Sequence, residues 1–207
     1  MPDRLNERQQ SIIPIAAFTA CGDLPRLEAS LHQGLDSALS ITESKEVLVQ
    51  LYAYCGFPRS LNALTTLMSV VKTRRQAGTE DKVGQSASPA PANWNSLVNG
   101  SENQTRLVGK PVTGALFDFA PTIDQFLKSH LFGDIFQRDV LDWQTREVAT
   151  ISALAAISGV EDQLRSHYAI SLNTGLTRAQ LQHFTDILSS AYDPERAASA
   201  RQILYTI

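Results

Sequence analysis

A helical pattern that occurs twice in the 207-residue sequence constrains the fold more than any other feature. Each occurrence consists of an apolar helix, a glycine break, a second helix, a capping box and a third helix. The boxes, Ser-Ile-Thr-Glu from Ser40 and Thr-Arg-Ala-Gln from Thr177, begin 137 residues apart. Gly22 and Gly159 are separated by the same shift. Agreement of several features at one fixed shift predicts a duplicated helical unit.

The sequence therefore predicts an all-α fold with a repeat at residues 1–77, a linker at 78–114 and a second repeat at 115–207. No stretch has the period-two alternation of a half-buried strand. Gly, Ser, Pro, Asn and Ala dominate the linker, which is expected to wrap the surface without regular structure. The expected helices cover residues 8–21, 24–37, 41–55, 58–71, 121–131, 145–158, 162–172 and 181–192.

Two of these helices, 8–21 and 145–158, are apolar on nearly every side, which predicts burial. Pro14 is expected either to bend the first helix or to set its start later. The apolar runs at 12–20 and 148–157 also indicate additional burial at interfaces between subunits.

Charge and hydropathy narrow the classes of partner that the protein is expected to bind. The net charge is −3 and no basic block offsets it, which argues against a nucleic-acid or anionic-membrane partner. The one basic cluster, Lys72-Thr-Arg-Arg75, lies at an expected helix end, where cations suit the helix dipole. No run is long enough to span a bilayer, and the N-terminus has no apolar core of a signal peptide. A cytoplasmic location is expected.

Cys21 and Cys55 lack C-x-x-C spacing, so they predict neither a redox pair nor a thiolate metal site. Buried free thiols are the expected state, with a structural disulfide as the less favoured alternative.

A polar row follows one side of the helix at 41–55. Glu43, Glu46, Gln50 and Tyr54 stand at i, i+3, i+7 and i+11, beside an apolar stripe. The row continues to a Gly-Phe-Pro corner, which indicates a face that looks into a cleft. The alternative is an ordinary amphipathic helix with a solvated polar face.

The two repeats differ at their polar positions. At the shift of 137, His167 replaces Ser30 and Glu147 replaces Gln10. One repeat thus carries carboxylates and a tyrosine, and the other a carboxylate and an imidazole. If the repeats pack about a pseudo-two-fold axis, these sets meet in one composite pocket. Neutral drift of solvated residues is the alternative.

These residues resemble the carboxymuconolactone decarboxylase family, which also contains the alkyl hydroperoxidase D proteins. The similarity covers about residues 8–75 and 115–192. Its motifs are Glu43-x-x-Glu46, Tyr54-Cys-Gly-Phe-Pro58, Leu131-Phe-Gly-Asp-Ile-Phe136, Thr145-Arg146-Glu147 and Leu164-Arg-Ser-His167. The resemblance implies an all-helical fold with two family domains.

The resemblance also implies site residues. His167 is the expected acid/base and Glu147 its support, because an imidazole titrates near neutral pH. Glu46 and Glu43 are further acid/base candidates, and Tyr54 is a hydrogen-bond donor. The candidates for binding substrate are Arg138 as a bidentate carboxylate anchor, Gln50 and His130.

The implied activity is loss of carbon dioxide from a small lactone or oxygenated carboxylic acid, with no metal or organic cofactor. The peroxidase branch of the family uses C-x-x-C-x-x-x-H, and Val160 and Gln163 stand where its thiols would be. A peroxiredoxin-like antioxidant that uses Cys55 or Cys21 remains one alternative. A non-catalytic ligand-binding or assembly protein is the other. Because single-unit relatives form rings of paired subunits, a duplicated chain is expected to form a homotrimer.

Overall fold

The computed structural model describes residues 3–37 and 39–207, and within these ranges it contains eleven α-helices, one π-helix and no β-strand. The predicted all-α class is confirmed. Predictions that include residues 1, 2 and 38 lie, at those positions, outside the described residues. Within the described ranges, no helix combines the length and the apolarity that crossing a bilayer requires.

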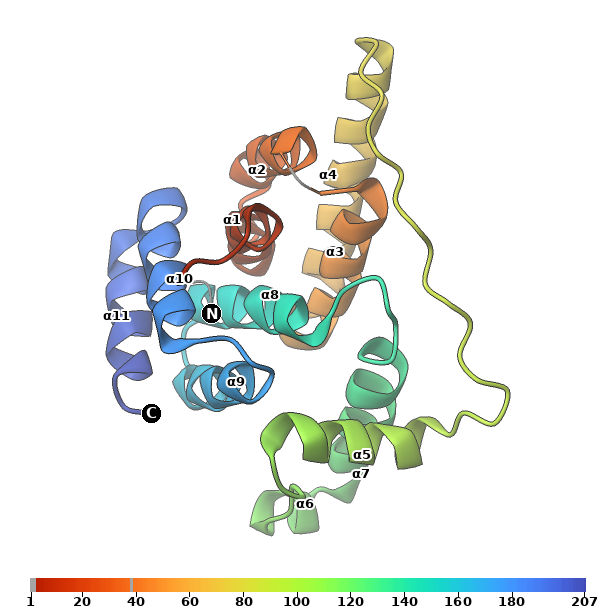
Figure 1. Cartoon of the computed structure of the whole chain (residues 1–207), viewed down its shortest axis with the longest axis vertical. Coiled ribbons are helices and arrows are strands. Elements are labelled where there is room, and N and C mark those ends of the chain that lie inside the picture. Colours follow the sequence, from red (N-terminus) through yellow and green to blue (C-terminus); the bar gives the residue numbers. More distant parts are fainter. Residues whose placement is uncertain (1–2, 38) are drawn as a thin grey trace.

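Two groups of four helices pack against each other (Figure 1). The first group is α1 (Glu7–Cys21), α2 (Leu24–Ser37), α3 (Ile41–Cys55) and α4 (Phe57–Gln76). The last group is α8 (Trp143–Ala156), α9 (Glu161–Asn173), α10 (Arg178–Ala191) and α11 (Pro194–Leu204). Along the chain, the two groups are separated by α5 (Ser96–Val108), α6 (Ala115–Phe119), α7 (Pro121–Phe126) and the π-helix η1 (Leu127–Ile135), and α5, α6 and α7 lie at the bottom of Figure 1.

Local signals set the helix boundaries in both groups. Ser40 and Thr177 form the two predicted capping boxes at the starts of α3 and α10. Gly22 and Gly159 follow α1 and α8 with φ angles of 80° and 81°, a left-handed conformation that glycine adopts without a Cβ clash. α1 begins at Glu7, so Pro14 lies inside the helix and does not set its start.

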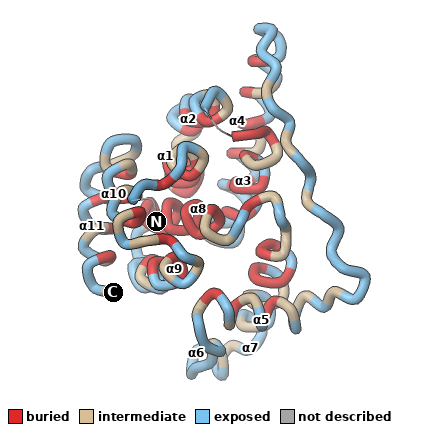
Figure 2. Tube along the Cα trace, viewed as in Figure 1, coloured by how far each residue is buried: buried red, intermediate tan, exposed pale blue. Residues whose placement is uncertain are grey.

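The core is centred on α1 and α8, which pack against each other and are buried along most of their length (Figure 2). Ile12, Ala16, Val148 and Ile151 are fully enclosed. Predicted burial of both helices is therefore correct. The additional subunit burial expected of the same runs is not needed to explain their apolarity, because each helix covers the other within one chain.

The predicted structureless linker is wrong over its second half. Residues 78–95 run extended along the outside of the molecule, but α5 occupies 96–108 (Figure 1). Asn95 caps this helix by accepting a hydrogen bond from the Val98 backbone, and Gly109 ends it with φ of 84°. Those two signals were in the sequence, but the polar composition of the segment obscured them.

α5 packs closely against η1 because both carry glycine at the crossing. A Cβ at Gly100 would lie 1.9 Å from the Lys128 carbonyl oxygen, and one at Gly133 would lie 2.2 Å from the Ser96 carbonyl oxygen. Only glycine permits this backbone approach. The pair α5–η1 encloses a second small core that includes Leu107 and Phe132.

Candidate active site

A polar seam crosses the apolar core where α3 packs on α8. Gln50 of α3 donates from Nε2 to the Arg146 carbonyl at 3.0 Å and to Thr150 Oγ1 at 2.9 Å. Arg146 of α8 donates from Nη1 to Gln50 Oε1 at 2.8 Å. All three side chains are fully buried. The predicted polar row of α3 therefore faces another helix rather than solvent, with Glu46 and Gln50 buried in the contact.

One end of the seam is an ion-pair cluster around Glu46, which is 4% exposed. Arg146 Nη2 donates to Glu46 Oε1 at 2.7 Å and to the Arg138 carbonyl at 2.7 Å. Arg138 binds the same carboxylate through Nε at 2.9 Å and Nη2 at 3.0 Å. Burial by itself raises the pKa of Glu46, but hydrogen bonds from both guanidiniums outweigh it and hold the pKa below its ordinary value.

The other end of the seam is a carboxylate–imidazole pair. Glu147 on α8 and His167 on α9 meet with Oε2 and Nδ1 2.8 Å apart. The Glu147 side chain is fully buried, while that of His167 is 12% exposed. The Glu147 carboxylate lies in the core because α8 is buried from Thr145 to Ala156. A carboxylate that accepts from Nδ1–H leaves Nε2 as the reactive nitrogen.

Tyr54, which belongs to the first helix group, contacts this pair. Its ring meets the His167 ring edge-to-face, with the centroids 5.6 Å apart. Burial, and then the nearby Glu147 carboxylate, raise the pKa of Tyr54 well above its ordinary value. The phenol therefore stays neutral at physiological pH and can donate a hydrogen bond.

Three residues along the seam carry buried polar atoms without a partner. Among the described residues, Glu147 Oε1, the Tyr54 hydroxyl and Arg146 Nε are buried and have no hydrogen-bond partner. Such atoms are rare in folded proteins, because an unpaired buried polar group costs roughly 1–3 kcal/mol. Because Glu147 Oε1 and the Tyr54 hydroxyl are unpaired beside the Glu147–His167 contact, we treat this end of the seam as the candidate active site.

The structure places the other predicted site residues in different roles. Glu43 accepts from the Ser40 backbone at 2.8 Å in the capping box and pairs with Arg8 at 3.1 Å. Gln50 is used within the seam, so its amide is not free for substrate. His130 lies on η1, half exposed, with Nδ1 2.9 Å from Asp134 Oδ2.

Glu46 and Arg138 are also paired in a way that differs from their expected roles as acid/base candidate and substrate anchor. Glu46 is an ionised partner of two guanidiniums, which is unlike a group that exchanges protons near neutral pH. Arg138 already uses Nε and Nη2 on this carboxylate, so a bidentate grip on a substrate would need that pair to open. Its side chain is 41% exposed, and Nη1 is the edge left for an anion.

Arg146 and Thr150 are the site residues that sequence reasoning missed. Arg146 stands in a helix that is buried from Thr145 to Ala156, and a fully enclosed guanidinium requires paired acceptors. That signal was legible in the sequence. The identity of the acceptors was not, because Glu46 lies 100 residues away.

Neither thiol forms a disulfide: Cys21 and Cys55 are free, as predicted, but they are half-buried and not fully buried as expected. Burial raises the pKa of Cys55 to about 11, although Arg59 opposes the shift. The Cys55 thiol donates to the Leu51 carbonyl of its own helix at 3.1 Å. A thiol in this state is a poor nucleophile at neutral pH.

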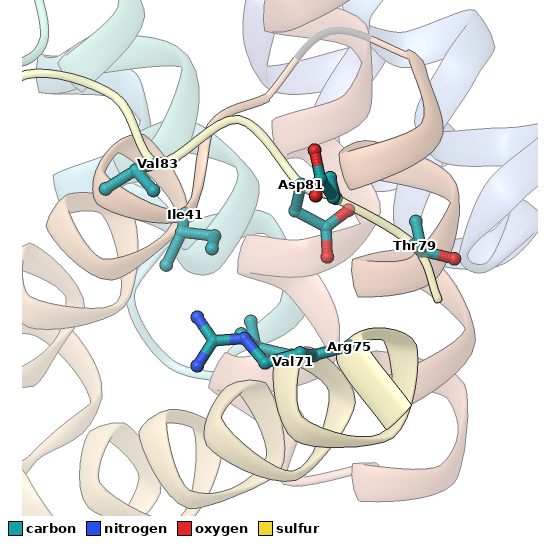
Figure 3. Close-up of a pocket in the computed structure, with 7 residues that line it drawn as sticks. Ile41, Val71, Arg75, Thr79, Asp81 and Val83 are labelled. Carbon is teal, nitrogen blue, oxygen red and sulfur yellow. The ribbon is translucent and has the colours of Figure 1, made fainter. Parts of the chain in front are cut away.

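A pocket of about 420 Å³, which neither Glu147 nor His167 lines, lies under the extended segment near the start of α3. Figure 3 shows Val71 and Arg75 of α4 facing Ile41 and the residues of that segment. Asp81 is held there by Arg74, with Nη2 and Oδ1 2.8 Å apart. This pocket contains no acid–base pair comparable with Glu147 and His167.

The protein is all-helical, and in its last helix group a buried carboxylate contacts a histidine. The family model described as carboxymuconolactone decarboxylase family matches residues 121–205, which include both Glu147 and His167. Those residues form a domain of that family. A 67-residue stretch is 34% identical to 4-carboxymuconolactone decarboxylase of Acinetobacter baylyi, covering 32% of this chain and 49% of that protein. The chain thus spans about half the length of this curated relative, a distantly related decarboxylase.

Proposed function

We propose that this chain is an acid–base enzyme that removes carbon dioxide from a small lactone or oxygenated carboxylic acid. The observation that carries the proposal is the 2.8 Å contact between the buried Glu147 carboxylate and Nδ1 of His167. A histidine held in one orientation by a buried carboxylate is suited to moving a proton at its other nitrogen. The similarity to a decarboxylase supports the choice of reaction.

The reaction would require an acceptor for one electron pair and a donor of one proton. The bond between the substrate carbon and its carboxylate breaks, and carbon dioxide leaves. The electron pair moves into the conjugated carbonyl of the lactone, and His167 Nε2–H then protonates the carbon that lost the carboxylate. Glu147 would stabilise the imidazolium before transfer, and the neutral Tyr54 hydroxyl, whose ring contacts His167, would donate a hydrogen bond to the oxygen that gains charge.

A tandem arrangement of two related units is the second part of the proposal. α9 begins 137 residues after α2, and α10 after α3, which is the shift of the two capping boxes. The packing also corresponds, since α3 contacts α8 as α1 contacts α10. Tyr54 of the first unit touches His167 of the second. We therefore infer one composite site per chain rather than two equivalent ones.

The test measures carbon dioxide release from 4-carboxymuconolactone and related lactone acids by the wild type and by His167→Gln. General acid–base catalysis contributes on the order of 10²–10⁴ in rate, so a loss of that size is expected from a variant that circular dichroism shows to be folded. His130→Gln is the matched control, because that half-exposed histidine lies on η1 and should leave the rate unchanged. Glu147→Gln should lower the rate and move the pH profile.

Two results would contradict the proposal. One is turnover that survives His167→Gln. The other is absence of turnover across the substrates, with binding detected by thermal shift, which would identify a ligand-binding protein. A Cys21→Ser/Cys55→Ser variant should retain full decarboxylase activity. Peroxide reduction by the wild type that this double variant loses would favour the antioxidant alternative, which the raised pKa of Cys55 opposes.

A further inference from the structure

The Thr150 hydroxyl, in the seam between α3 and α8, has one hydrogen-bond partner among the described residues. It accepts from Gln50 Nε2 at 2.9 Å. Its own hydrogen is not used in that bond, because a threonine hydroxyl is a donor as well as an acceptor. Thr150 is fully buried, so bulk water does not reach it. Buried donors without an acceptor are rare and costly, which raises the question of where this hydrogen goes.

The neighbouring Gln50 amide can be oriented in only one way. Its Oε1 accepts from Arg146 Nη1 at 2.8 Å, and a guanidinium can only donate. The amide nitrogen must therefore face the other two partners, the Arg146 carbonyl at 3.0 Å and Thr150 Oγ1 at 2.9 Å. Thr150 is thus the acceptor in its bond with Gln50, and its hydrogen points away from that amide.

The usual acceptor for a buried helical threonine is occupied at this position. Such a hydroxyl commonly donates to the carbonyl four residues earlier, as Thr19 of α1 does to Ile15 at 2.8 Å. For Thr150 that carbonyl belongs to Arg146. It already accepts the helix bond from the Thr150 backbone and the bond from Gln50, and a carbonyl oxygen has two lone pairs. The Thr150 hydrogen therefore needs an acceptor on another side chain.

Tyr54 offers such an acceptor. It follows Gln50 by four residues and so lies on the same face of α3. Its hydroxyl is buried and has no hydrogen-bond partner in the part of the chain that the structure describes. Thr150 acts on this phenol, since it lowers the pKa of Tyr54 against the larger rise that burial causes. Glu147 Oε1 is the other unpaired acceptor near this end of the seam.

We propose that Thr150 is a positioning residue, whose hydroxyl donates to the Tyr54 oxygen and leaves the phenol hydrogen for the oxygen of the substrate. The inference rests on the proposed function, in which Tyr54 is that donor. Every bond of the chain then runs in one direction, from the Arg146 guanidinium through Gln50 and Thr150 to the phenol. Each bond of such a chain polarises the next, which makes Tyr54 a stronger donor. A donor to the phenol oxygen lowers the pKa of a tyrosine, in agreement with the direction of the effect of Thr150.

The first test compares the kinetics of Thr150→Val with those of Thr19→Val. The matched control removes an equally buried hydroxyl that donates to an ordinary helix carbonyl. Thr150→Val should lower kcat about tenfold, the effect of one hydrogen bond made in the transition state, and leave KM unchanged. Thr19→Val should leave both unchanged. Thr150→Ser should recover most of the lost kcat and Thr150→Ala should not, and these two variants differ by the hydroxyl alone.

A double-mutant cycle with Tyr54→Phe separates action through the phenol from a general structural role. Thr150→Val should cost no further kcat in the Tyr54→Phe background. The same cycle applied to Tm needs no turnover. The Tm loss caused by Thr150→Val should be smaller by about 2–4 °C in the Tyr54→Phe background, the shift expected for one hydrogen bond in a chain of this size. Equal losses in the two backgrounds would overturn the proposal and are expected if Thr150 donates to Glu147 Oε1 instead.

A spectroscopic measurement follows the phenol directly. In protein labelled with ¹³C at the tyrosine Cζ atoms, the resonance that is missing from Tyr54→Phe belongs to Tyr54. This resonance should move in Thr150→Val and stay in place in Thr19→Val, because only the first variant removes a hydrogen bond to the phenol oxygen. An unmoved resonance in Thr150→Val, or a kcat equal to that of an active wild type, would overturn the proposal.

Failure of the proposed function can be told apart from failure of this inference. A wild type without turnover on any lactone acid would contradict the decarboxylase assignment. The Tm cycle and the Tyr54 resonance would still decide whether Thr150 donates to Tyr54, because neither measurement needs a substrate. Circular dichroism should show unchanged helix content in every variant.

Discussion

Replacing Arg146 by methionine should be among the most destabilising single changes in this chain. Its guanidinium is fully enclosed and donates to Glu46 Oε1, Gln50 Oε1 and the Arg138 carbonyl at 2.7, 2.8 and 2.7 Å. Methionine fills a similar length but donates to none of them. The change leaves two acceptors buried without a donor, while Glu46 keeps Arg138.

Breaking a buried ion pair by removing one partner costs about 3–5 kcal/mol. We expect that loss in the free energy of unfolding, measured by urea titration with circular dichroism at fixed protein concentration. For a chain of this size, about 1 kcal/mol corresponds to about 2–4 °C in Tm, so Tm should fall by roughly 6–20 °C.

Two further variants make the test specific. Arg138→Met removes a guanidinium from the same carboxylate, but that side chain is 41% exposed, so the loss should be smaller, about 1 kcal/mol. A Glu46→Leu/Arg146→Met variant removes both buried charges and should recover a large part of the loss, because apolar replacement of a buried pair is often nearly neutral. An Arg146→Met loss below about 1 kcal/mol, or no larger than that of Arg138→Met, would refute the reasoning.

Two other predictions follow from local geometry and charge. Because the pKa of Glu46 is held below its ordinary value, its stabilising contribution is complete above that ordinary value and is lost as the pH falls through the lower, folded-state pKa. Glu46→Gln should therefore be less stable than wild type at pH 7, and the difference should shrink under acidic conditions; a constant difference from pH 7 to pH 3 would contradict this. Gly100→Ala should cost about 1–3 kcal/mol, because the new Cβ would meet the Lys128 carbonyl, whereas Ser101→Ala on the same helix should be nearly neutral in the same melts. Equal Tm values for these two variants would show that α5 and η1 can separate without loss.

Local sequence signals predicted much of the helical framework. Capping boxes at Ser40 and Thr177 and the breaks at Gly22 and Gly159 act within a few residues, so their effects could be read without the fold. The helices that escaped prediction had similar signals. α11 begins after Asp193, which caps it, followed by Pro194 in the first turn.

In the candidate site, the sequence likewise predicted the residues but not all of their contacts. The sequence singled out Glu147 and His167, and the structure places them in contact. The helical period of the sequence also placed Glu46, Gln50 and Tyr54 on one face of α3. Their different roles depend on α8, since Glu46 and Gln50 meet Arg146, whereas Tyr54 reaches His167. Helical period fixes a direction around one helix axis, but not the partner on the next helix.

By itself, then, the sequence determined an all-helical chain, most of its helix boundaries and the residues able to carry acid–base chemistry. Only the tertiary structure decided which charged side chains are paired with an opposite charge and which are not. The reason is that capping and periodicity depend on neighbours within about one turn. The ionisation of a carboxylate depends on burial and on every charge within a few ångströms, and residues such as Glu46 and Arg146 come together only when the chain packs.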